Sequence, residues 1–121
     1  MFKFVFSLII AGTLMLPVHS FAASKTVFGE IERVLATPAD KWGGCLVRTT
    51  AKYGVLNCSK LWLSLDCEGA VEGNTKSAGQ RRFDLATLAV LTERRVKLRI
   101  FDNVKLNGYC YADQVELLPT N

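Results

Sequence analysis

The chain has 121 residues, of which 15 are basic, 11 are acidic and one is a histidine. This length suits a single domain, and the formal charge of +4 is a mild excess without any block of lysine or arginine. Such a charge is thin for the basic groove that nucleic-acid-binding proteins use, so we do not expect nucleic acid as a partner.

The first 22 residues match a secretory signal peptide. Lys3 supplies a positive start, residues 4–17 form an apolar run, and Ser20-Phe21-Ala22 is a small-x-small cleavage site, with cleavage expected after Ala22. The alternative, a permanent membrane anchor, is disfavoured because the run is short. We therefore expect an exported protein, periplasmic or secreted, with one mature domain over residues 23–121 and no membrane span in that domain.

The mature domain carries 14 basic and 11 acidic residues, all four cysteines and no histidine, because Lys3 and His19 lie in the leader. An even number of cysteines in an exported domain of this size predicts two disulfides. No Cys-x-x-Cys pair is present, so a zinc site is not expected.

The first predicted strand covers residues 25–36. Val27 and Ile31 point to one face there, and Glu30 and Glu32 point to the other. A loop rich in proline and glycine follows over residues 37–44 and contains Trp42.

Two further strands are predicted over residues 45–50 and 61–65, and we expect them to form an antiparallel hairpin centred near Leu56. The second of these strands alternates, with the inward positions expected at Leu61, Leu63 and Leu65.

The register of this hairpin predicts the disulfides. Cys45 falls opposite Cys67 on the inward face, so a cross-strand bridge can join them. Cys58, near the hairpin tip, is then left to pair with Cys110. A slip of one residue would remove this argument, because it reverses the faces of every side chain.

Residues 68–80 are polar and glycine-rich, and we expect them to form a mobile connection. The segment over residues 79–101 then predicts a helix followed by a strand. Its apolar residues between Leu85 and Leu91 predict a helix buried on all sides, which ends at Arg94 and Arg95.

The two remaining strands complete the domain. After the helix the period changes to two, with Val96, Leu98 and Ile100 facing inward and Lys97 and Arg99 facing outward. A loop is expected from Asp102 through Asn107-Gly108, and a last strand over residues 110–118.

The resulting order is three strands, one helix and two strands, which is the order of the five-stranded Greek-key barrel called the OB-fold. The first and fourth strands pair in that barrel, so Glu30 and Glu32 are expected to meet Lys97 and Arg99. A two-layer α+β sandwich is the competing architecture.

Catalysis is not expected. Without a histidine, the mature chain has no Ser-His-Asp or Cys-His arrangement and no histidine-ligated metal. The carboxylates that remain, Asp66 with Glu68 and Asp113 with Glu116, lie in no evident cleft. We therefore predict a protein that is not an enzyme and needs no cofactor.

Binding is better supported by the sequence. OB-folds bind oligosaccharides and oligonucleotides on the face of strands 2 and 3 and in the adjoining loops. The candidate ligand-binding residues that fall there are Trp62, Arg48, Trp42 and Tyr109. Aromatic rings beside polar groups suit sugar stacking. The alternative is that Trp62 packs under a neighbouring loop and that Tyr111 caps the core.

A family resemblance points the same way. The segment FDLATLAVLTERRVKLRIFDN, followed by Gly108-Tyr109-Cys110, resembles the helix-to-strand segment of small exported OB-fold proteins, including the B subunits of subtilase-type and pertussis-type bacterial toxins. The resemblance implies an OB-fold and a glycan-binding, ring-forming subunit whose helix faces a central pore. It assigns no site residue. We expect an exported glycan-binding module; the alternative is a periplasmic structural or protein-interaction protein without a small ligand.

Overall fold

The computed structural model describes residues 12–13, 23–38 and 41–120. The expected signal peptide therefore lies, apart from residues 12–13, outside the described residues. The elements follow the predicted order and are β1 (Ser24–Ala36), β2 (Cys45–Thr49), β3 (Ser59–Ser64), α1 (Lys76–Thr92), β4 (Arg95–Leu106) and β5 (Tyr109–Leu117).

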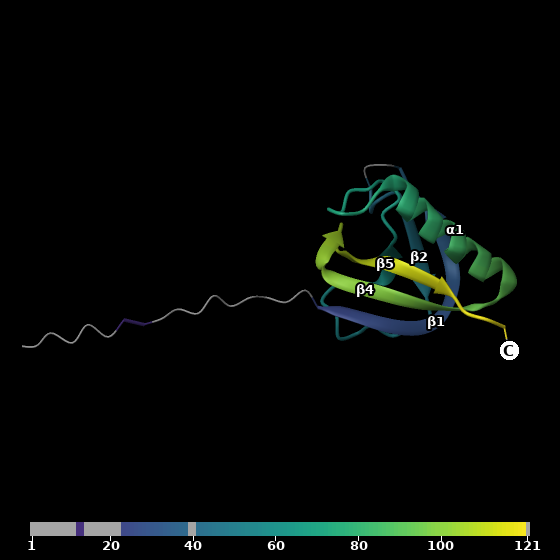
Figure 1. The fold of residues 1–121 in the computed structure, drawn as a ribbon, viewed down its shortest axis with the longest axis horizontal. Helices are drawn as coiled ribbons and strands as arrows, with labels where there is room; N and C mark the ends of the chain where they lie inside the picture. The colour runs from purple at the N-terminus through teal and green to yellow at the C-terminus, as the bar shows by residue number, and fades with distance from the viewer. Residues whose placement is uncertain (1–11, 14–22, 39–40, 121) are drawn as a thin grey trace, which may run out of the picture.

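The five strands close into a barrel in the order β1-β2-β3-β5-β4. Figure 1 shows the β4 strand between β1 and β5. The long strand β1 closes it, because its first half pairs with β4 and its second half pairs with β2. The β3 and β5 strands are parallel, and the other neighbours are antiparallel. This is the predicted OB-fold topology, and the α+β sandwich is excluded.

The alternation of the strands builds the core. Val27 and Ile31 of β1 are buried, and Val96, Leu98 and Ile100 of β4 are fully buried. Burying these aliphatic side chains stabilises the fold by roughly 1.5–3 kcal/mol each. The core residues therefore lie where a period of two had placed them.

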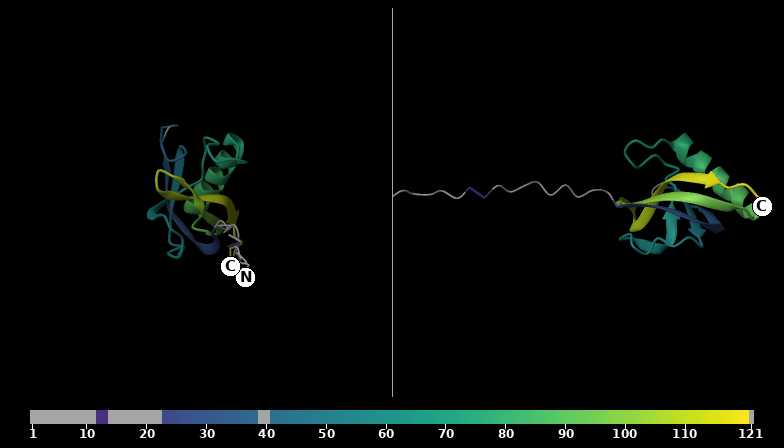
Figure 2. Two further views of the ribbon diagram at one scale, coloured as in Figure 1. Left: turned by 90° about the vertical axis from the view of Figure 1, so that its left-hand side faces the viewer. Right: turned by 60° about the horizontal axis from the view of Figure 1, so that its bottom comes forward.

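The α1 helix packs chiefly on β1 and β5, along one side of the barrel (Figure 2). The prediction of a helix buried on all sides is wrong. Only Gly79, Ala86 and Ala89 are buried, whereas Leu85, Leu88 and Leu91 are 36%, 43% and 76% exposed. Small residues face the barrel because they allow the helix backbone to come close to it, and the leucines are left on the outside.

Both predicted disulfides are present. Cys45 is bonded to Cys67 and Cys58 to Cys110, with Cα–Cα distances of 5.6 and 5.5 Å. The predicted register of the hairpin is nevertheless wrong by two residues. Leu46 pairs with Ser64 and Val47 with Leu63, so Cys45 falls opposite Leu65.

The predicted Cys45–Cys67 pairing is still correct, because a shift of two residues leaves each side chain on the same face of the sheet. Asp66, with a left-handed φ of 52°, turns the chain just past β3 and brings Cys67 to Cys45. Of the three leucines predicted to face inward, Leu63 and Leu65 are fully buried. The prediction is wrong for Leu61, which is 50% exposed.

The expected ion pairs between β1 and β4 are also wrong, although the two strands do pair. Lys97 and Arg99 reach β5 instead, where Lys97 Nζ lies 3.6 Å from Glu116 and Arg99 Nη2 lies 2.6 Å from Asp113. In the β1–β4 register, Glu30 lies opposite Arg95. The register explains the difference: on β1, Lys97 lies opposite Phe28 and Arg99 lies opposite Thr26, whereas on β5 Lys97 lies directly opposite Glu116.

Two predicted loops are partly replaced by regular structure. The helix already begins at Lys76, after Thr75, whose side chain accepts a hydrogen bond from Ala78 N–H. The β4 strand continues to Leu106, so only Asn107 and Gly108 form the turn to β5, both with positive φ. An Asn-Gly pair of this kind makes a two-residue hairpin turn.

Among the described residues, no helix is long and apolar enough to cross a membrane.

Candidate functional site

The outward face of β1, β2 and β3 carries the first candidate site. Leu35 of β1 pairs with Leu46 of β2, and Arg33 pairs with Arg48 in the adjacent row. The antiparallel register of β2 and β3 pairs Val47 with Leu63, so the next position places Trp62 of β3 beside Arg48 of β2. Apolar and cationic side chains therefore lie in neighbouring rows across three strands.

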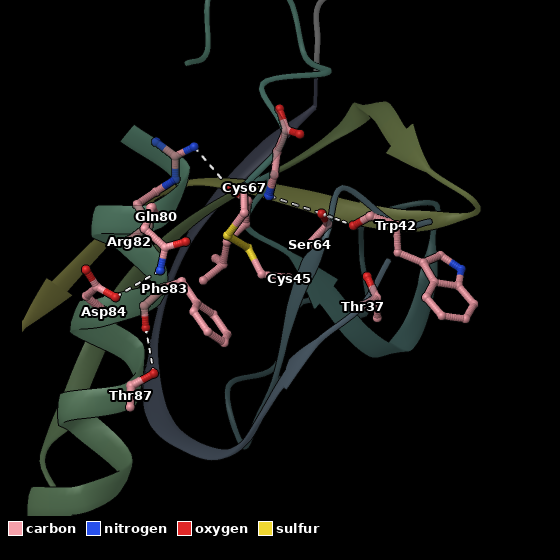
Figure 3. The surroundings of a disulfide bond; sticks show 12 residues. Thr37, Trp42, Cys45, Ser64, Cys67, Gln80, Arg82, Phe83, Asp84 and Thr87 are labelled. Atoms are coloured by element: carbon pink, nitrogen blue, oxygen red, sulfur yellow. Dashed lines mark hydrogen bonds between the residues drawn. A yellow bond between two sulfur atoms is a disulfide. The ribbon is translucent and has the colours of Figure 1, made fainter. Parts of the chain in front are cut away.

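The loop between β1 and β2 presents Trp42 at the edge of this face. Trp42 has φ 53°, and the two glycines after it also have positive φ, which keeps the loop tight. Its carbonyl oxygen accepts a hydrogen bond from Ser64 Oγ at 2.6 Å, and its N–H donates to Asn107 Oδ1 at 3.2 Å. Figure 3 shows the Trp42 indole pointing away from the Cys45–Cys67 disulfide.

Three of the four predicted ligand-binding residues converge here. Trp42, Trp62 and Tyr109 line a pocket of about 70 Å³ together with Leu35 and Leu46. The rings of Trp42 and Tyr109 meet edge to face, with centroids 6.2 Å apart. We call this pocket and its three rings the aromatic surface.

Arg48, the fourth predicted residue, does not line the pocket. Its Nε atom lies 4.0 Å from Glu32, an exposed pair of small energetic value. The cation beside the aromatic surface is instead Arg33, whose guanidinium lies 5.6 Å from the centroid of the Trp62 ring. Sequence reasoning missed Arg33 because only the β1–β2 register identifies it as a neighbour of β3.

A second pocket, of about 390 Å³, lies on a different part of the barrel and shares no residue with the aromatic surface. Its walls are the loop over residues 71–74, the first turns of α1, and the β4 and β5 strands near Phe101 and Tyr111. The strands part there because residues 102–104 bulge out of the β4–β5 ladder. We call it the polar pocket.

The fully buried carboxylate of Asp66 organises the loop beside the polar pocket. It accepts hydrogen bonds from Ala70 N–H at 2.9 Å, from Val71 N–H at 2.8 Å and from Asn74 Nδ2 at 2.9 Å. The prediction of an irregular connection over residues 68–80 is wrong for residues 76–80, which begin α1, and the residues before them form a hydrogen-bonded loop. A charge buried in this way needs such partners.

Arg82 of α1 continues this network. Its Nη2 atom donates to Leu65 O at 3.0 Å, to Asn74 Oδ1 at 2.6 Å and to Tyr111 Oη at 3.2 Å. The guanidinium also lies 5.6 Å from the Tyr111 ring centroid. No periodicity in the sequence identifies this cluster, because its members come from the two residues after β3, the following loop, α1 and β5.

Burial shifts the pKa of two tyrosines. Desolvation raises the pKa of Tyr111, and the positive charge of Arg82 partly opposes that rise. Burial alone raises the pKa of Tyr53 to about 12. Both phenols are therefore neutral hydrogen-bonding groups at physiological pH.

Within the described part of the chain, no three His, Cys, Asp or Glu side chains are grouped so that they could hold a metal ion. Comparisons with family models, with curated proteins and with solved structures found no match to this chain.

Proposed function

We propose that this chain is an exported, non-enzymatic binding module that recognises glycans or glycoconjugates through the aromatic surface. The observation that carries the proposal is the convergence of Trp42, Trp62 and Tyr109 from three separate elements on the outward face of the barrel. Export is supported by the signal-peptide pattern of residues 1–22 and by the two disulfides.

The chemistry of the surface suits a sugar. The C–H face of a pyranose ring packs on an aromatic ring, and the hydroxyl groups need polar partners at its edge. Arg33 lies against Trp62, and Arg48 lies beside Arg33, so donors flank the rings. A pocket of about 70 Å³ is well below the ~300 Å³ needed to enclose a small molecule, so the sugar would stack on the surface.

A tryptophan-fluorescence titration with glycans selected on an array tests this proposal. We expect saturable binding that Trp62→Ala abolishes while the circular dichroism spectrum stays unchanged. Phe28→Ala is the matched control, because it removes an exposed aromatic ring elsewhere on β1 and should leave binding intact. Absence of binding to every glycan on the array would overturn the proposal.

The second candidate function is a structural or protein-interaction role without a small ligand. It is favoured by the exposed leucines of α1, Leu85, Leu88 and Leu91, which form an apolar row on the outside of the helix. The toxin B-subunit resemblance fits this candidate as well, since it implies a homo-oligomer. Light scattering of the wild type and of Leu88→Glu tests self-association: an oligomer that Leu88→Glu dissociates makes this leucine row an interface, and a monomer in both contradicts a self-associating form. Because a glycan-binding ring is also an oligomer, the second function is supported over the first when the oligomer binds no glycan on the array.

A further inference from the structure

The polar pocket contains a cation without an acidic partner. Among the described residues, no carboxylate lies within ion-pair distance of Arg82. Its Nη2 atom donates to three neutral acceptors, which are the backbone oxygen of Leu65, Oδ1 of Asn74 and the hydroxyl of Tyr111. These hydrogen bonds hold the Arg82 guanidinium at the wall of the pocket.

The other terminal nitrogen of Arg82 is available to a ligand. Within the described residues Nη1 donates to no protein acceptor, and unlike Nε, which is fully buried without a partner, Nη1 is not fully buried. Nη1 is therefore accessible to solvent and has no hydrogen-bond acceptor within the described residues. A fixed guanidinium with free donors is preorganised for a negatively charged oxygen.

Three acidic groups lie near this cation, and within the described chain none of them forms an ion pair with Arg82. Asp113 is held by Arg99 through two hydrogen bonds, Nε to Oδ1 at 2.8 Å and Nη2 to Oδ2 at 2.6 Å. Asp66 is buried behind the loop, and its oxygens are occupied by backbone N–H groups and by Asn74. Glu72 is the acidic residue on the pocket wall that has no ion pair within the described chain.

We propose that the polar pocket binds a small organic ligand through its carboxylate or sulfate group, with Nη1 of Arg82 as the principal donor. The pocket volume of about 390 Å³ is in the range that holds a small molecule. Phe101 supplies an apolar wall, and Asn103 supplies a neutral polar side chain. This site is separate from the aromatic surface, so the inference does not depend on the proposed function.

Ala78 allows a test that preserves the fold. It lines the pocket at the third position of α1, and its N–H donates to the side chain of Thr75 at 3.1 Å. Glutamate is well tolerated at this position, so Ala78→Glu adds a negative charge to the pocket wall, one helical turn before Arg82, without weakening the helix. Ala78→Gln has the same size and capping ability without the charge, and is the matched control.

Binding is measured from the chemical shifts of the residues that line the polar pocket, in titrations with D-glucuronate, sulfate and D-glucose at constant ionic strength, so that any sugar bound at the aromatic surface is not counted. We expect both anions to bind and glucose, which lacks the carboxylate, not to bind. Ala78→Glu should weaken anion binding about tenfold or more, Ala78→Gln should change it less than about twofold, and Glu72→Gln should strengthen it. Arg82 itself is a poor target, because its removal also releases Leu65 and Asn74.

The relative strength of the two anions identifies the ligand class. Tighter binding of glucuronate supports an organic acid that uses the whole pocket, whereas equal binding supports a site for the oxyanion group alone. The proposal is overturned if neither anion binds at about 10 mM, ten times a Kd of ~1 mM. It is also overturned if Ala78→Glu and Ala78→Gln bind equally well, or if glucose binds as well as glucuronate.

Discussion

The backbone N–H of Trp42 donates a hydrogen bond to Oδ1 of Asn107 at 3.2 Å, across 65 residues of sequence. Trp42 lies in the loop after β1, and Asn107 is the first residue of the turn between β4 and β5. Tyr109, immediately after that turn, meets the Trp42 ring edge to face. The Asn107 side chain therefore joins the loop that carries Trp42 to the turn that precedes Tyr109. Asn107 is thus a positioning residue for two of the three rings of the aromatic surface.

We expect Asn107→Gly to loosen Trp42 without disrupting the hairpin. Gly-Gly still fits a two-residue turn with positive φ at both positions, but the acceptor for Trp42 N–H is lost. In a Trp62→Phe background, where Trp42 is the remaining tryptophan, acrylamide quenching of fluorescence should increase. Asn107→Asp keeps both the turn and the acceptor and should quench like the parent. Equal quenching in both variants would show that the hydrogen bond does not position Trp42.

The contact between α1 and the end of β3 makes a second prediction. A Cβ atom on Gly79 would collide with the backbone carbonyl of Asp66 and with the Cα of Cys67. Helix propensity alone favours Gly79→Ala by up to ~1 kcal/mol, but overpacking costs about 1–3 kcal/mol, so we expect net destabilisation. Urea unfolding measures the difference.

Gly54→Ala is the control for that experiment, since no atom lies within 4 Å of the added Cβ and the φ of Gly54 is not positive. Its free energy of unfolding should stay within about 0.5 kcal/mol of the wild type. A Gly79→Ala protein as stable as Gly54→Ala would contradict the close approach of α1 to the Asp66 turn.

The sequence predicted most of what depends on periodicity. The alternation around Val27, Leu63 and Leu98 was enough to place the strands, and their order around one helix was enough to select the barrel. The same parity identified the Cys45–Cys67 disulfide although the hairpin register was wrong, because the error was an even number of residues, and Cys58–Cys110 followed as the remaining pair. The burial of α1 was mispredicted, since a count of apolar residues does not show that its alanines face the barrel.

The two candidate sites differ in how much of each could be predicted from the sequence. Trp42, Trp62 and Tyr109 could be predicted together, because OB-fold topology brings the loop after β1, the face of β3 and the start of β5 to one place. Arg82 and Asp66 could not, because their contacts depend on a loop without periodicity that folds around a buried carboxylate. Hydrogen bonds between residues distant in sequence leave no repeating pattern.

The two disulfides should contribute unequally to stability. They close loops of different length, with sequence separations of 22 residues for Cys45–Cys67 and 52 for Cys58–Cys110. Restricting the unfolded chain then stabilises the fold by about 3.4 and about 4.1 kcal/mol respectively. We expect the Cys58→Ala/Cys110→Ala double variant to be less stable than Cys45→Ala/Cys67→Ala in urea unfolding. The reverse order would show that native contacts around Cys67 outweigh the loop-length effect.

Tyr53 should make stability fall at alkaline pH. It is buried, its hydroxyl donates to Lys60 O at 3.4 Å, and desolvation raises its pKa from 10.0 to about 12. The unfolded chain therefore ionises this phenol first, so the contribution of Tyr53 is fully present below pH 10 and is lost as the pH rises towards about 12. Deprotonation of lysines also affects stability in this range, so the comparison is made with Tyr53→Phe, which lacks the titrating group. The difference in free energy of unfolding between the wild type and Tyr53→Phe should decrease between pH 10 and about 12. A difference that stays constant across that window would mean that the Tyr53 phenol is solvated in the folded protein.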